Sequence, residues 1–250
     1  MAIVRKAVAR DFDKIYLLFS KFKNPKLTKE DWRLLFVDHW KCNEGYFGYV
    51  LEEENSIVGF LGMIFSRRTV DGKEAKFCNL TSWVVEEKFR NQSLLLFIPI
   101  MKLNDYTVTI YTASKETYAV AKKFGFQDLE SKLRIIFPVP SISTLLTFCE
   151  IDINGKRLSE NLTGETLKAY KDHLPFQCFH VHIQTPLGKC YLIGTRIYRK
   201  RFAFSQIHHI SHSKVFSNFA GRIALSICSS LNTIATIVDE RFLQGHKIRL

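Results

Sequence analysis

Residues 46–85 form the stretch of the sequence that most narrowly limits the fold. The stretch reads YFGYVLEEENSIVGFLGMIFSRRTVDGKEAKFCNLTSWVV, and two breaks, at EENS and VDGK, divide its apolar, β-branched and aromatic residues. The Asp-Gly pair in the second break favours a tight hairpin turn. The stretch therefore predicts three consecutive antiparallel strands.

Helices and further strands are predicted before and after this stretch. The segment 9–22 has apolar residues at helical spacing, and a second helix over 28–40 begins with Thr28 as N-cap. The run 93–103 fits a helix that Pro99 would bend or interrupt. The other predicted elements are a strand at 3–8, a strand at 106–113, a helix at 114–126 that ends at Gly125, and a strand at 132–140.

The second half of the chain follows a connector at 138–144, where turn-forming residues gather. Its predicted elements are a helix at 163–174, strands at 178–185, 190–200 and 202–211, a helix at 213–231 and a strand at 233–240. This order resembles the second half of the first region. We therefore expect two α/β domains, 1–140 and 141–250, the second of which partly repeats the first.

The charge of the chain favours anionic ligands. The net charge is +12, which attracts nucleic acids, anionic membrane surfaces or phosphorylated molecules such as coenzyme A. The densest basic cluster is RIYRKR at 196–201, and no nucleic-acid-binding signature accompanies it. The composition therefore favours a phosphorylated small molecule over a nucleic acid.

Cysteine spacing and hydropathy place the protein in a reducing compartment. The six cysteines are far apart without CxxC spacing, which argues against a zinc cluster. The N-terminal residues lack the apolar core of a secretory signal. The apolar stretch 219–238 contains an arginine and an asparagine, and we interpret it as a buried helix and strand. We expect a cytoplasmic protein with reduced thiols.

The stretch EKFRNQSLLLF, residues 87–97, passes from a charged turn directly into a leucine-rich run. It follows a predicted strand and leads into a predicted helix. Backbone N–H groups at a helix N-terminus bind anions, because they have no partner inside the helix. Two interpretations stay open: a phosphate-binding turn without the usual glycines, or a helix start that binds nothing.

Four stretches of the first half, in this order, resemble the Gcn5-related N-acetyltransferase (GNAT) superfamily. They are IVRKAVARDFDKIYLLF, SIVGFLGMIF, SWVVEEKFRNQSLL and SKETYAVAKKFGF, which resemble the opening strand and helix, a central strand, the fourth strand with its acyl-CoA turn, and the helix that follows the fifth strand. The resemblance implies a mixed, largely antiparallel sheet flanked by helices. It also implies acyl transfer from acetyl-CoA or another acyl-CoA.

The resemblance implies a set of acyl-CoA contacts. Val85 matches the strand-end residue whose backbone faces the thioester and pantetheine, and Arg90 matches the first residue of the pyrophosphate turn. The residues that complete the turn are Asn91, Gln92, Ser93, Leu94 and Leu95, and Ser114 stands where the family often has an asparagine that contacts coenzyme A. Ser93 and Leu95 replace two small residues, usually glycines, that allow close backbone approach.

Candidate catalytic residues come from both halves of the chain. Ala121 occupies the position of the tyrosine that commonly protonates the leaving thiolate in the family, and Tyr118, one helical turn earlier, is the candidate to replace it. His180 and His182 share one face of a predicted strand. They are candidates to line the acceptor site or to take a proton from the acceptor amine.

Other interpretations of these side chains stay open. The histidines could be structural, or could bind a metal, although no metal site is predicted. His39 and Glu44 are further candidates for the base, since they precede the predicted hairpin strands where the acceptor loop of the family lies.

These features together predict an acyl-CoA-dependent N-acyltransferase. The acceptor would be the amine of a small molecule, such as an amino sugar or a nucleotide-sugar, and would attack the thioester directly. The alternative is a catalytically inactive GNAT-like protein that serves as a binding or regulatory module. We expect a bacterial protein without an integral membrane segment, and leave a homodimer open.

Overall fold

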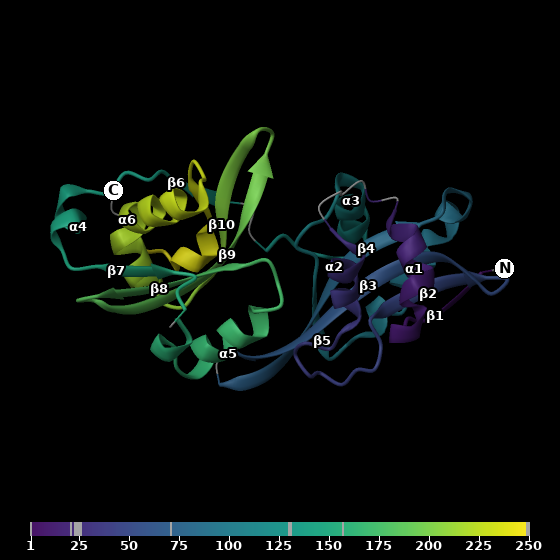
Figure 1. The fold of residues 1–250 in the computed structure, drawn as a ribbon. Helices are drawn as coiled ribbons and strands as arrows, with labels where there is room; N and C mark the ends of the chain where they lie inside the picture. The colour runs from purple at the N-terminus through teal and green to yellow at the C-terminus, as the bar shows by residue number, and fades with distance from the viewer. Residues whose placement is uncertain are drawn as a thin grey trace. The chain divides into compact units, whose positions relative to one another are not determined.

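The computed structural model describes residues 2–20, 22, 27–70, 72–129, 132–156 and 158–248. The chain divides into two compact units, Met1–Phe126 and Gln127–Leu250 (Figure 1). Each unit is built on its own sheet. No helix in the described part of the chain has both the length and the apolar composition that crossing a bilayer requires.

The first unit contains a five-stranded sheet in the order β1-β2-β3-β4-β5. The strands are β1 Ile3–Lys6, β2 Gly48–Glu53, β3 Ser56–Val70, β4 Lys73–Val85 and β5 Tyr106–Thr109. Neighbours are antiparallel except β4 and β5, which are parallel. The three antiparallel strands predicted over 46–85 are therefore confirmed as β2, β3 and β4.

The first of the two predicted turns has a geometry suited to a hairpin. Glu54 and Asn55 connect β2 to β3, with φ values of +48° and +63°. Two central residues with positive φ are typical of a type I′ turn, whose twist matches that of the flanking strands. In the second turn, between Val70 and Lys73, Asp71 lies outside the described residues.

Helical segments cover both faces of the first sheet. Their bounds are η1 Ala9–Asp11, α1 Phe12–Phe19, α2 Lys29–Arg33, η2 Leu34–Phe36, η3 Glu87–Phe97, η4 Ile100–Lys102 and α3 Lys115–Lys123, where η marks a 3₁₀ helix. Buried residues of α1 and η2 pack on one face, and those of η3 and η4 pack on the other. Thr28 caps α2 as predicted, because its Oγ1 accepts the Asp31 N–H at 3.1 Å.

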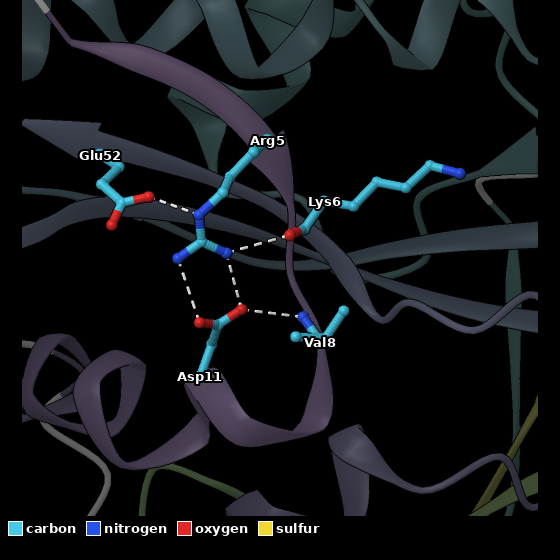
Figure 2. Close-up of polar contacts among 5 residues, drawn as sticks. All are labelled: Arg5, Lys6, Val8, Asp11 and Glu52. Atoms are coloured by element: carbon cyan, nitrogen blue, oxygen red, sulfur yellow. Dashed lines mark hydrogen bonds and ion pairs between the residues drawn. The ribbon is translucent and has the colours of Figure 1, made fainter. Parts of the chain in front are cut away.

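Arg5 of β1 ties the first helical segment to the sheet (Figure 2). Its guanidinium donates to the two carboxylate oxygens of Asp11 at 2.8 and 3.1 Å, and to Glu52 of β2. Asp11 also accepts the Val8 N–H at 2.9 Å. Burial of Asp11 would raise the pKa of its carboxyl, but the hydrogen bonds from Arg5 and Val8 hold that pKa below its usual value. The network fixes where the first helix begins.

The second unit contains a six-stranded sheet in the order β6-β11-β10-β9-β8-β7. Its elements are β6 Leu133–Ile136, α4 Ile142–Leu146, β7 Glu150–Ile153, η5 Leu158–Asn161, α5 Gly164–His173, β8 Phe179–Thr185, β9 Gly188–Arg199, β10 Phe202–Ile210, α6 Ser213–Leu231, β11 Thr236–Asp239 and η6 Glu240–Leu243. The main core lies between the sheet and α6. Residues of η5 and α5 pack on the other face.

The strand predicted at 132–140 belongs to the second unit. β6 pairs antiparallel with β11, and Ile136 is buried in the core beneath α6. The boundary that we expected after residue 140 therefore lies earlier, between Phe126 and Gln127. Local periodicity indicates that a segment is a strand, but it does not determine which sheet that strand joins.

The second sheet repeats the strand order of the first. β7 to β11 have three antiparallel pairings followed by a parallel one, as β1 to β5 do. Each sheet also has a register shift near the end of its fourth strand. β6 is an additional strand at the edge of the second sheet. The expected α/β class, with largely antiparallel sheets flanked by helices, is confirmed.

Candidate functional site

The parallel strands β4 and β5 separate along their length. They are paired from Lys76↔Tyr106 to Asn79↔Thr109. No pair follows, although every residue of both strands is described and β4 continues to Val85. Thr109 Oγ1 donates to Asn79 Oδ1 at 3.2 Å at this last pair. The strands therefore form an open fork whose apex is the Asn79–Thr109 pair.

A bulge in β4 lies directly beyond this apex. The register between β3 and β4 shifts between Phe60 and Gly62, so that Ser82 and Trp83 of β4 lie opposite a single residue of β3. Ser82 adopts a left-handed backbone conformation with φ of +52°, which is uncommon for a residue other than glycine. Bulges bend a strand and redirect its side chains. This one bends β4 where the fork opens.

A cavity of about 220 Å³ occupies the fork. Its apolar lining consists of Phe22, Leu61, Leu80, Trp83, Phe97 and Ile110, and its small or hydroxyl-bearing lining consists of Thr81, Ser82, Thr112, Ala113, Ser114 and Thr117. Phe22 packs in the cluster under α1, whereas Phe97 packs in the cluster on the opposite face. The cavity therefore has walls from both faces of the sheet, and it combines apolar surface with a few polar groups, as ligand sites do.

The N-terminus of α3 contributes to the wall of this cavity. Ser114 is the N-cap, and its Oγ accepts the Thr117 N–H at 3.1 Å. The first N–H groups of a helix lack intrahelical partners, and the helix dipole adds partial positive charge there. Another donor lies in the lining, because Trp83 Nε1 is buried and has no hydrogen-bond partner among the described residues.

Basic side chains gather at this helix N-terminus. The carboxylate of Glu116 accepts hydrogen bonds from the Glu116 backbone N–H and from the Ser114 side chain, and these bonds lower its pKa. The positive charges of Lys115 and Arg90 lower that pKa further. Arg90 belongs to η3, so its charge reaches the first turn of α3 from a different element. The Arg90 side chain is exposed, and its Nη1 lies 3.3 Å from Glu87 Oε1. Two basic side chains from different elements, Lys115 and Arg90, are therefore near the first turn of α3, together with the carboxylates of Glu116 and Glu87.

The stretch 87–97 forms η3 rather than a turn that opens an α-helix. Its last residues, Leu96 and Phe97, are buried, and Pro99 separates η3 from η4. Proline lacks an N–H and cannot continue a helical hydrogen-bond ladder. The interruption predicted at Pro99 is therefore confirmed, whereas the α-helical type predicted for 93–103 is wrong, because both segments are 3₁₀ helices.

The predicted acyl-CoA contacts lie in different surroundings. Ser114 lines the cavity, and Val85 lies at the end of β4, paired with Gly59. The five residues that complete the predicted turn, Asn91, Gln92, Ser93, Leu94 and Leu95, lie within η3 and outside the cavity lining. Among them, Gln92 has a buried Oε1 without a hydrogen-bond partner in the described part of the chain.

The sequence interpretation missed most of the polar lining. Thr81, Ser82 and Thr112 follow the paired segments of two parallel strands, and Thr117 lies one turn into α3. Hydroxyl residues after neighbouring parallel strands are a signal that the sequence does contain, since ligands of α/β sheets bind beyond the carboxyl ends of such strands. The bulge at Ser82 has no comparable signal.

The candidate acid and bases of the first unit lie outside the cavity lining. Tyr118 is about half exposed on α3, and Lys122 Nζ lies 6.0 Å from the centre of its ring. Ala121 is buried. Glu44 accepts a hydrogen bond from the Tyr106 hydroxyl, and His39 Nε2 lies 3.1 Å from the Leu34 carbonyl oxygen.

His180 and His182 lie in β8 of the second unit and are only 6% and 5% exposed. His180 Nδ1 lies 2.7 Å from the Tyr191 hydroxyl, and Tyr170 of α5 packs edge-on against its ring. His182 Nε2 has no hydrogen-bond partner among the described residues. Burial lowers the pKa of both imidazoles. No group of three metal-ligating side chains occurs in the described part of the chain.

Comparisons with known proteins connect this architecture to one group of solved structures. No protein-family model matches the sequence, and no curated protein matches it significantly. A GCN5-related N-acetyltransferase from Kribbella flavida matches with a TM-score of 0.62 and 11% identity over 96% of this chain. One from Anabaena variabilis matches with a TM-score of 0.56 and 10% identity over 95% of this chain.

The matches extend over both units of this chain. A Pyrococcus horikoshii protein matches with a TM-score of 0.55 and 14% identity, over 96% of this chain and 80% of its own length. The chain spans 64% and 65% of the Kribbella and Anabaena proteins. At such identities the comparison concerns the fold. This chain has the fold of the GCN5-related N-acetyltransferase superfamily.

Proposed function

We propose that the protein is an acyl-CoA-dependent N-acyltransferase that uses the fork between β4 and β5. The observation that carries this proposal is the fork itself, with its cavity of about 220 Å³ between two parallel strands. An elongated ligand with amide groups can lie beside the unpaired part of β4 as a further strand would, by β-augmentation. The amide-containing pantetheine arm of coenzyme A has this chemistry.

The residues around the cavity fit the other parts of such a ligand. Arg90, Lys115 and the N-terminus of α3 provide positive charge for phosphate groups. Trp83 and Phe97 form an apolar wall for the acyl end, and the buried Trp83 Nε1 is a donor that lacks a partner. When bound, the thioester supplies an activated acyl group. The chain orients it and shields it from water.

The acceptor that we propose is the amine of a small molecule, such as an amino sugar or a nucleotide-sugar, in a bacterial cytoplasm. The support is the net charge of +12, which favours phosphorylated acceptors. In this proposal the amine attacks the thioester carbonyl directly. Tyr118 is the proposed acid, and His180 and His182 remain proposed as acceptor-side residues.

Ligand-induced stabilisation tests the proposal directly. A native-state ligand raises the unfolding temperature in proportion to the logarithm of its concentration above Kd. We expect acetyl-CoA or a longer acyl-CoA to stabilise the protein. Ala113→Trp should abolish the shift, because Ala113 lines the cavity. Ala119→Trp is the matched control, since Ala119 is exposed on α3, outside the lining.

Two outcomes would contradict the site. One is the absence of a shift with any acyl-CoA at millimolar concentration. The other is an equal shift in the Ala113 and Ala119 variants, which would place the ligand elsewhere.

The second candidate function is a catalytically inactive module that binds an acyl-CoA or a related metabolite. The observation that favours it is the cavity lining, in which the polar side chains are hydroxyls and the indole of Trp83, and to which the described residues contribute neither a carboxylate nor an imidazole. Release of free thiol from acyl-CoA with a panel of amines separates the two candidates. Stabilisation by acyl-CoA without thiol release would support the module.

A further inference from the structure

The cavity in the fork has an apolar end at the apex and a polar end at α3. Leu80 of β4 and Ile110, the residue after β5, directly follow the last strand pair, and both line the cavity. The hydroxyl-bearing residues Thr112, Ser114 and Thr117 come further along the chain, where α3 begins. A ligand whose polar part lies beside α3 therefore directs its other end toward aliphatic side chains at the apex.

Two aromatic side chains form walls of this cavity on opposite faces of the sheet. Phe22 packs in the cluster under α1, and its ring stacks on that of Trp32 with the ring centres 5.7 Å apart. On the other face, the ring centre of Phe97 lies 4.9 Å from that of Trp83 and 5.1 Å from that of Phe124. Each wall is backed by a further aromatic ring, which limits how far it can shift.

The polar groups near the apex offer little to a charged acyl group. The hydroxyls of Thr81 and Ser82 contact each other at 3.2 Å. The described residues contribute no lysine or arginine to the cavity lining. A carboxylate at the end of an acyl chain would therefore be buried without a cation, which is costly. The lining favours an apolar acyl group.

The volume of the cavity indicates the size of that group. It is about 220 Å³, whereas an engineered protein cavity of about 150 Å³ that is lined by Leu, Ile and Phe binds benzene. Part of the space in the fork belongs to the pantetheine arm beside β4. An acetyl group is smaller than benzene and would leave apolar wall uncovered, and each methylene that fills such a pocket raises affinity about fourfold.

We propose that this protein transfers an apolar acyl group larger than acetyl, with about six carbon atoms, and that Leu80 and Ile110 select it at the apex. This inference rests on the acyl-CoA-dependent function proposed above and specifies the acyl group of that reaction. The amine nitrogen forms a bond to the acyl carbon, and the carbon–sulfur bond breaks. The sulfur leaves with the electron pair of that bond, and the proton that the amine loses ends on the thiol.

Dissociation constants of the wild-type chain for a series of acyl-CoAs test the proposal. Isothermal titration calorimetry compares acetyl-CoA, butanoyl-CoA, hexanoyl-CoA and succinyl-CoA. We expect Kd to fall about tenfold or more from acetyl-CoA to hexanoyl-CoA, because the additional methylene groups bury apolar surface at the apex. We expect succinyl-CoA to bind no more tightly than acetyl-CoA, since its carboxylate finds no cation there.

An Ile110→Trp variant tests where the acyl chain lies. Its larger side chain fills the apex, so the ratio of the Kd for acetyl-CoA to the Kd for hexanoyl-CoA should fall toward one. Tyr111→Trp is the matched control and should keep the wild-type ratio, since Tyr111 is the next residue, is 57% exposed and lies outside the lining. The wild-type series decides the question by itself where the Ile110 variant does not fold.

Three results would overturn the inference. If acetyl-CoA or succinyl-CoA bound as tightly as hexanoyl-CoA, the acyl selectivity would be wrong while the acyl-CoA-dependent function would stand. If the preference for hexanoyl-CoA persisted in a folded Ile110→Trp variant, the acyl chain would lie away from the apex. If no acyl-CoA bound at all, the proposed function would fail together with the inference.

Discussion

The two sheets share a strand order but differ at the place where their parallel strands separate. In the first unit, the residues after β5 line a cavity, among them Thr112, Ala113 and Ser114. In the second unit, the residues after β11 form η6, and Leu243 of this segment is buried in the core beneath α6. Each fourth strand has a register shift before its end, so the backbone irregularity is common to both.

This difference indicates why the separation of two parallel strands leaves a cavity in one unit and not in the other. In both sheets the pairing of the parallel strands ends just before a bulge, and the bulge bends the fourth strand. The side chains that come next decide whether the space stays open. Small and hydroxyl-bearing residues leave it open in the first unit, whereas Leu243, which follows β11, is part of a filled core in the second.

Removing one phenylalanine from each unit should give the largest effect and should separate the two. Phe216 is a fully buried residue of α6, so Phe216→Ala should destabilise the second unit by about 3–5 kcal/mol. Phe22 is half-buried and faces the cavity, so Phe22→Ala should cost roughly 1 kcal/mol in the first unit. Denaturant unfolding followed by circular dichroism measures both values.

The comparison fails if both variants lose stability equally. In that case the cavity wall would be as tightly packed as the core under α6, and the opening between β4 and β5 would be a closed space. A transition that splits into two steps in one variant would show which unit that residue supports.

Lowering the pH should affect the second unit before the first. Burial lowers the pKa of His180 and His182, so the unfolded chain binds more protons than the folded chain below the ordinary histidine pKa of about 6.5. The second unit should therefore lose stability as the pH falls from 7 to 5. The contribution of Asp11, whose pKa is lowered, is lost only below its ordinary value of about 4.

Thermal unfolding between pH 7 and pH 5 measures this loss. His182→Leu should reduce it, because the variant has one fewer buried imidazole to protonate. His246→Leu is the control, since His246 is exposed. An equal acid sensitivity of the wild-type protein and the His182 variant would show that this imidazole accepts a proton without cost to the fold.

Much of the first sheet could be predicted from local patterns, and much of the site could not. Apolar, β-branched and aromatic runs divided by turn signals predicted β2, β3 and β4, and the Thr28 signature predicted the start of α2. The strand at 133–136 was predicted in place but assigned to the wrong sheet, since its partner β11 is some hundred residues away in sequence. Pairing over such a distance leaves no local signal.

The candidate site shows the same limit. Ser114, which the family resemblance alone suggested as a coenzyme A contact, lines the cavity, whereas Thr81 and Ser82 line it because of a bulge that depends on tertiary structure. The leucine-rich run after Glu87 was predicted as an α-helix but forms η3. Whether this run forms an α-helix or a 3₁₀ helix depends on how Leu96 and Phe97 pack in the core. Such packing is a tertiary property that the local sequence does not show.

The smallest predicted effect concerns backbone strain at the two left-handed residues Ser82 and Asn232, which have φ values of +52° and +50°. Relief of about 1 kcal/mol of strain, partly offset by the entropy of glycine, should make Ser82→Gly more stable by roughly 0.5 kcal/mol. Asn232→Gly should be nearly neutral, because asparagine tolerates this conformation at a helix end. Denaturation midpoints of the two variants measure the difference. A destabilised Ser82→Gly protein would show that the 3.2 Å contact between the Ser82 and Thr81 hydroxyls outweighs the strain, so that this side chain, and not the backbone alone, holds the fork open.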